Sequence, residues 1–107
     1  MPGEMARFVR EDSDAATCLV VTGEVDLANI DEFNEQLTRL VDDAHSPAIL
    51  DLRQLAFFDS TALNAVVRAH RRAEAQGVRL FVWPSPMARR VINITGLESW
   101  LNLDGHS

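Results

Sequence analysis

Residues 49–63, with the sequence ILDLRQLAFFDSTAL, decide how this chain folds. Pro47 interrupts the chain shortly before them, and the apolar run 48–52 has the length and composition of a buried strand. A loop with two aromatic residues follows, and Asp59 and Ser60 then provide the residue types that favour the start of a helix. A strand that leads into a helix in this way predicts an α/β fold.

Two further helices are predicted, one on each side of this unit. Asn29 is suited to the N-cap of the first, and Glu32, three residues later, would complete a capping box. Ser85 is suited to the N-cap of the last, because Pro86 then occupies the first helical position, where proline is tolerated. The three helix starts are therefore expected at Asn29, at Asp59 or Ser60, and at Ser85.

Glycines and apolar spacing define the rest of these helices. Gly77 and Gly96 are placed to end the second and third helices in the left-handed conformation. Apolar residues recur at helical spacing in all three, so each is expected to pack one face against a sheet. The residues expected on the buried faces are Ile30, Phe33, Leu37, Leu40 and Val41; Leu63, Val66, Val67, His70 and Ala73; and Met87, Val91 and Ile94.

Short β-prone runs alternate with the helices. Strands are predicted at 6–10, 17–22, 48–52 and 78–83. A polar turn is expected over 11–14, and Gly23 would end the second strand. The run 17–22 is continuously β-prone, as in strands that are covered on both faces.

The order of these elements predicts how the sheet is built. Strands that alternate with helices need crossover connections, which make neighbouring strands parallel and the crossovers right-handed. We therefore expect a small α/β layer fold in which segments 17–22, 48–52 and 78–82 are parallel neighbours. A final short strand or helix that includes Leu97, Trp100, Leu101 and Leu103 would close the core.

Length, charge and cysteine content limit the function. A chain of 107 residues is expected to form a single domain, residues 1–107. The net charge of -6 and the lack of lysine argue against direct binding of nucleic acid. No apolar stretch approaches the roughly 20 residues of a membrane span, so we expect no membrane insertion and a cytoplasmic location. Cys18 is the sole cysteine, which excludes an intramolecular disulfide and indicates a buried thiol.

The hydroxyl pair Ser60 and Thr61 stands at the predicted start of the second helix. The N–H groups and the positive end of the helix dipole favour an anion there. A phosphate on Ser60 would bring about -1.5 to -2 charges and three acceptor oxygens to this point. The alternative is purely structural, with Asp59 or Ser60 serving only to cap the helix.

Three blocks of this sequence, residues 22–28, 49–52 and 58–63, resemble the signature blocks of the STAS domain family, which includes anti-sigma factor antagonists. The resemblance extends through 77–80 and 90–97 and so covers nearly the whole chain. It implies a four- or five-stranded sheet with helices packed mainly on one face.

The resemblance also implies partners and a switch. The partner would be an anti-sigma factor that is also a serine kinase, and binding it would release the sigma factor that regulates transcription. Phosphorylation at Ser60 would end the complex, and a phosphatase would restore it. The residues implied in partner binding are Asp26, Asp59, Thr61 and Ala62. Asp26 can equally be a turn-forming aspartate, and Ala62 replaces the glycine usual in the family, which would narrow the docking surface.

Other functions remain open at this stage. A STAS-type subunit of a lipid ABC transport complex would use Ser60 or Thr61 to contact the transporter ATPase without phosphorylation. A hydrolase with Ser60 as nucleophile lacks a matching base, because His45, His70 and His106 are far apart in the sequence. No glycine-rich phosphate loop is present, so ATP is not expected to bind. We expect no enzyme activity, no metal and no cofactor, and a monomer or weak dimer.

Four more residues have structural interpretations. His70 is read as a histidine at the edge of the core, and Trp83 and Trp100 as packing residues. Asp51, at the end of a predicted buried strand, is read mainly as a structural carboxylate whose charge is satisfied locally.

Overall fold

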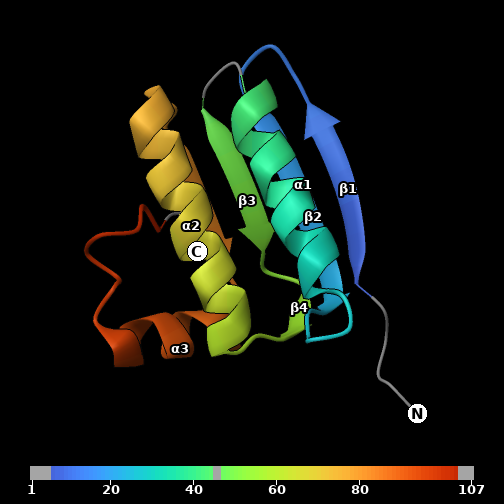
Figure 1. Ribbon diagram of the computed structural model, residues 1–107, viewed down its shortest axis with the longest axis vertical. Helices are drawn as coiled ribbons and strands as arrows, with labels where there is room; N and C mark the ends of the chain where they lie inside the picture. The colour runs from blue at the N-terminus through green and yellow to red at the C-terminus, as the bar shows by residue number, and fades with distance from the viewer. Residues whose placement is uncertain (1–5, 45–46, 104–107) are drawn as a thin grey trace.

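Strands and helices alternate through the computed structural model, which describes residues 6–44 and 47–103 (Figure 1). The elements are β1 Arg7–Asp12, β2 Thr17–Glu24, α1 Ile30–Asp43, β3 Ala48–Leu52, β4 Leu55–Phe57, α2 Ser60–Gln76, β5 Leu80–Pro84 and α3 Pro86–Thr95. The α/β class and all three predicted helices are confirmed. The short strand β4 falls in a segment that was expected to be a loop.

The sheet has the order β1-β2-β3-β5, with β4 paired to the end of β2. The expected parallel neighbours are confirmed: Leu19 pairs with Leu50, and Leu50 pairs with Val82. β1 runs antiparallel to β2 along its whole length. The polar turn was predicted too early, because Glu11 and Asp12 still belong to β1 and pair with β2.

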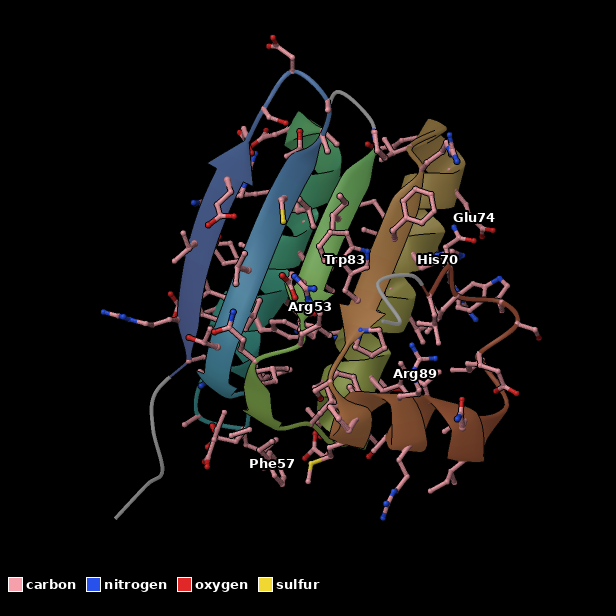
Figure 2. All side chains as sticks on the ribbon, turned by 180° about the vertical axis from the view of Figure 1, so that it is seen from behind. Arg53, Phe57, His70, Glu74, Trp83 and Arg89 are labelled. Atoms are coloured by element: carbon pink, nitrogen blue, oxygen red, sulfur yellow. The ribbon has the colours of Figure 1, made fainter. Side chains whose placement is uncertain are left out.

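The helices α1 and α2 lie side by side on one face of the sheet, and α3 crosses its lower end in Figure 1. Seen from behind, in Figure 2, the other face carries none of the helices in the described part of the chain. The arrangement expected from the family resemblance, with helices mainly on one face, is therefore confirmed.

The prediction that 17–22 is covered on both faces is wrong. Leu19 and Val21 are fully buried beneath the helices, whereas Cys18 and Val20 point to the opposite face and remain partly exposed. The strand also continues past Gly23, whose φ of 88° coincides with an irregular pairing between β2 and β4.

The core lies between the sheet and the inward faces of α1 and α2. The predicted residues Phe33, Leu37, Leu40 and Val41 are buried in α1, as are Leu63, Val66, His70 and Ala73 in α2, while Ile30 and Val67 are partly exposed. The predicted face of α3 is wrong at two of its three positions: Met87 and Ile94 are exposed, Val91 is partly buried against the core, and Ala88 and Ile92 are buried instead. Apolar residues lie along two stripes of this ten-residue helix. The stripe with Ala88 and Ile92 is the one that packs against the end of the sheet.

The caps of the last two helices follow the sequence closely. The hydroxyl of Ser85 accepts a hydrogen bond from the N–H of Ala88 at 3.1 Å. Gly77 and Gly96 end their helices at φ values of 72° and 77°, in the left-handed region that glycine enters without steric cost. The strand after Gly77 begins later than predicted, at Leu80.

The segment after α3 closes the outer edge of β5 without forming a full strand or helix. Leu101 is buried, the N–H of Val82 donates to the carbonyl of Asn102 at 2.9 Å, and Leu103 forms a single bridge with Val82. Trp100 packs edge-on against the buried ring of His70, with 4.3 Å between centroids. The packing roles of His70 and Trp100 are therefore as expected.

Candidate functional site

The carboxyl ends of the parallel strands and the amino ends of the helices meet at one edge of the sheet, the lower edge in Figure 1. In open α/β sheets this edge is where binding sites are usually built. Asp26 lies in the loop after β2, and Asp59, Ser60 and Thr61 lie at the start of α2. The fold thus brings the predicted site residues to this one edge, which we call the switch edge.

Asp59 forms the N-cap of α2. Its carboxylate accepts a hydrogen bond from the N–H of Ala62 at 3.1 Å, and its carbonyl accepts from the N–H of Leu63 at 2.9 Å. The predicted capping role is therefore performed by Asp59, and Ser60 occupies the first helical position with an exposed side chain. The first N–H groups of a helix have no intrahelical acceptor, so an anion on Ser60 would meet donors there.

Ala62 does not lie on the partner-binding surface, where the family resemblance had placed it. Its side chain is fully buried among the core residues, whereas Ser60 is exposed and Thr61 is half-buried. A methyl group that points into the core adds no bulk to the outer surface. The expectation that Ala62 contacts a partner directly, or narrows the docking surface with its side chain, is therefore corrected.

The loop before α1 is held by the side chain of Asn29. Its Oδ1 accepts a hydrogen bond from the N–H of Asp26 at 2.9 Å, and its Nδ2 donates to the carbonyl of Glu24 at 2.8 Å. Asn29 is the N-cap residue of α1, but its side chain makes no cap bond, so the predicted capping box with Glu32 is wrong. Asp26 forms a turn, because its Oδ1 accepts from the N–H of Ala28 at 2.9 Å.

We predict that Asn29→Ala destabilises the protein by about 1–2 kcal/mol, because two partly buried hydrogen bonds are lost together. The matched control is Asn34→Ala on the same helix, whose side chain makes one exposed bond to Arg68 and should cost under about 0.5 kcal/mol. Urea unfolding followed by circular dichroism measures both. Equal stabilities for the two variants would contradict the bracing role of Asn29.

Exposed apolar side chains surround the switch edge. Leu27 is 80% exposed in the loop after β2, Phe57 is 38% exposed at the end of β4, and Met87 is 45% exposed in the first turn of α3. Figure 2 shows Phe57 at this end of the molecule. The sequence did not reveal this surface, because an exposed apolar residue has the same identity as a buried one. Grouped exposure of this kind is typical of protein-binding surfaces.

A second polar cluster lies on the helix-free face, at the carboxyl ends of β3 and β5 (Figure 2). Asp51 is only 4% exposed, and its two oxygens accept hydrogen bonds from Nε and Nη2 of Arg53 at 3.0 and 2.9 Å. Burial alone would raise the pKa of Asp51, but the bonds from the Arg53 side chain and backbone N–H hold it below its ordinary value. The structural interpretation of Asp51 is therefore confirmed.

The guanidinium of Arg53 also lies over the ring of Trp83, 4.6 Å from its centroid. Trp83 is thus a packing residue of this face, as expected. The neighbouring thiol of Cys18 is half-buried, and burial together with the charge of Asp51 raises its pKa to about 11. A thiol with that pKa is protonated at neutral pH and is therefore a weak nucleophile.

Within residues 6–44 and 47–103, no three His, Cys, Asp or Glu side chains are grouped to hold a metal ion. In the same part of the chain, no helix combines the length and the apolar character that crossing a bilayer requires. His45 and His106 lie outside the described residues.

Comparison with solved structures places this architecture among known proteins. An anti-sigma factor antagonist from Mycobacterium paratuberculosis is 22% identical, with a TM-score of 0.80 over 94% of this chain and 86% of that one. The phosphorylated form of the Bacillus cell fate determinant SpoIIAA is 25% identical, with a TM-score of 0.67 over 94% and 93% of the two chains. A chain of the Acinetobacter MlaFEDB complex in its ATP-bound Vtrans2 conformation is 26% identical, with a TM-score of 0.68 over 90% and 99%.

The sequence also matches a known protein family. The family model of the STAS domain matches residues 7–106, a range that includes every helix and strand described above. This match agrees with the three sequence blocks, the sheet order and the position of the helices on one face. The chain therefore belongs to the STAS domain family.

Proposed function

We propose that this chain is a cytoplasmic anti-sigma factor antagonist, a binding protein without catalytic activity of its own. In this proposal it binds an anti-sigma factor that is also a serine kinase, and it thereby releases the sigma factor. Phosphorylation at Ser60 ends the complex, and a phosphatase restores the binding form.

The observation that carries the proposal is the exposed Ser60 at the first position of α2, on an edge with exposed apolar side chains. A kinase needs access to the hydroxyl, and the apolar residues Leu27, Phe57 and Met87 offer contact area to a docked protein. The helix terminus would stabilise the phosphorylated side chain, so modification would not unfold the domain. Similarity to anti-sigma factor antagonists of the same fold supports this assignment.

Intact-mass measurement after incubation with candidate anti-sigma factor kinases and ATP tests the proposal. We predict that the wild type gains the mass of one phosphate, that Ser60→Ala gains none, and that Thr61→Ala is modified like the wild type. Thr61 is the matched control because it is the adjacent hydroxyl and is half-buried. Modification of Ser60→Ala to the same extent as the wild type would contradict the assignment of Ser60.

A second function is favoured by one specific observation. The match to a chain of the MlaFEDB complex covers 99% of that chain at 26% identity. On this alternative, the protein is a STAS-type subunit of a lipid ABC transport complex, and the switch edge contacts the transporter ATPase without phosphorylation. Stable binding to such an ATPase, together with no mass gain from any anti-sigma factor kinase, would favour it. Neighbouring genes for a transporter would point the same way.

A further inference from the structure

The helix-free face of the sheet carries a group of apolar side chains beside the pair of Asp51 and Arg53. Its outward positions follow from the strand register, in which Val9 pairs with Val20, Cys18 with Ile49, and Ile49 with Phe81. Val9 is 47% exposed, and Cys18, Val20, Ile49, Phe81 and Trp83 are each partly exposed. We call these six residues the open face (Figure 2).

The composition of the open face matches that of a covered surface. A sheet with one face in water normally alternates apolar and polar residues, whereas parallel strands that are covered on both faces read as continuous apolar runs. Residues 18–21 form such a run, yet the helices cover only one of its faces. The inward residues Leu19 and Val21 are fully buried, while their neighbours Cys18 and Val20 are not.

We propose that a second copy of this chain covers the open face, with the two sheets packed face to face about a two-fold axis parallel to the strands. Such an axis places β1 of one copy over β5 of the other. Cys18 and Ile49 link Glu11 of β1 to Phe81 of β5 in one row across the sheet. Arg79 lies over the ring of Phe81, 5.2 Å from its centroid. Each Glu11 would therefore meet the Arg79 of the other copy, and two-fold symmetry makes this contact twice.

The local charge is compatible with self-association although the whole chain carries -6. The face and its margins hold Glu11 and Asp51 against Arg7, Arg53 and Arg79, and Asp51 is already paired with Arg53. The contacting surfaces are therefore close to neutral, and the acidic character lies elsewhere. The switch edge stays free in this dimer, so the proposal does not depend on the function proposed above.

Sedimentation equilibrium over a concentration series from about 1 μM to about 1 mM tests the proposal, since this is the range of weak to moderate association. The wild type should form a dimer within the series. Ile49→Glu should raise the dissociation constant at least about tenfold, because it places a charge in the centre of an apolar contact. Ile94→Glu is the matched control, because Ile94 is 79% exposed on α3, away from the open face. The dimer of this variant should have the same dissociation constant as that of the wild type.

A charge reversal tests the same contact without touching the apolar centre. Glu11→Arg and Arg79→Glu should each weaken the dimer, and the double variant should regain much of the lost affinity because the opposite charges meet again. Circular dichroism confirms that each variant is folded. A wild type that stays monomeric throughout would overturn the proposal, and so would a dimer that survives Ile49→Glu unchanged or a double variant without recovery.

Discussion

The Ser60→Asp variant is expected to bind the partner kinase about tenfold to hundredfold more weakly than the wild type, whereas Ser60→Ala keeps nearly the same affinity. Ser60 is exposed at the start of α2 with the carboxylate of Asp59 beside it. A partner that fits this edge in the unmodified state meets an uncharged hydroxyl. A carboxylate there must shed its water at the interface, which costs several kcal/mol when no partner group pairs with it.

The size of the effect follows from the arithmetic of binding. A loss of about 1.4–2.8 kcal/mol corresponds to the expected tenfold to hundredfold change in affinity. The free protein should stay folded, because the amino end of a helix favours a negative charge. Isothermal titration calorimetry against the kinase measures the affinity, and thermal unfolding of the free variant checks its fold.

The control for added charge is Ser13→Asp. Ser13 is exposed in the turn between β1 and β2, at the opposite end of the molecule from the switch edge (Figure 1). The Ser13→Asp substitution adds the same charge as Ser60→Asp but at a distant position. It should therefore change the affinity for the kinase only slightly if the position of the charge matters. Equal affinities for the wild type, Ser60→Ala and Ser60→Asp would contradict a role of Ser60 in controlling binding. They would favour a protein that binds its partner whether or not Ser60 is modified.

Arg53→Ala should destabilise the fold by about 2 kcal/mol at pH 7. It removes the side-chain partner of Asp51 and leaves a carboxylate that is only 4% exposed. Breaking a fully buried ion pair costs about 3–5 kcal/mol. We expect the smaller loss of about 2 kcal/mol because half of the Arg53 side chain is in water. Arg39→Ala is the control: its bond to Glu35 is exposed on both sides and should contribute under about 0.5 kcal/mol.

The loss should depend on pH in a defined direction. The pKa of Asp51 is lower in the folded protein than its unfolded value of about 3.9. The pair therefore stabilises the fold above about pH 4, and this contribution fades as the pH falls through the folded pKa. As the pH falls below about 4, the loss should shrink, apart from the part due to the lost contact between Arg53 and Trp83. Urea unfolding at pH 7 and pH 3 measures this, and an equal loss at both would contradict it.

Local chemistry explains the parts of this protein that could be read from sequence. Asp59 and Ser85 cap their helices with bonds to N–H groups three residues later, and these need only a few adjacent residues. Gly77 and Gly96 adopt the left-handed conformation because they lack a side chain, whatever lies around them. The alternation of strands and helices then restricts the fold to a mostly parallel sheet.

The parts of the candidate site that depend on neighbouring residues could also be predicted from the sequence. The position of Ser60 at the start of a helix follows from its neighbours, as does the turn at Asp26. The sequence could not tell that Ala62 is buried while Leu27 and Met87 are exposed. Burial depends on which distant segments cover a side chain, and amino-acid identity gives only an average tendency.

The remaining features were decided by contacts between segments that are far apart in the chain. β4 exists because residues 55–57 reach the end of β2, where they find pairing partners. The end of the sheet selects the stripe of α3 that contains Ala88 and Ile92, and Asn29 turns back to the β2 loop instead of capping its own helix. The sequence by itself therefore determined the three helices, the strands β1, β2, β3 and β5, and their order, because their signals lie within a few residues of one another. The tertiary structure alone decided that β4 forms, which stripe of α3 is buried and which face of the sheet the helices leave open, because these depend on long-range packing.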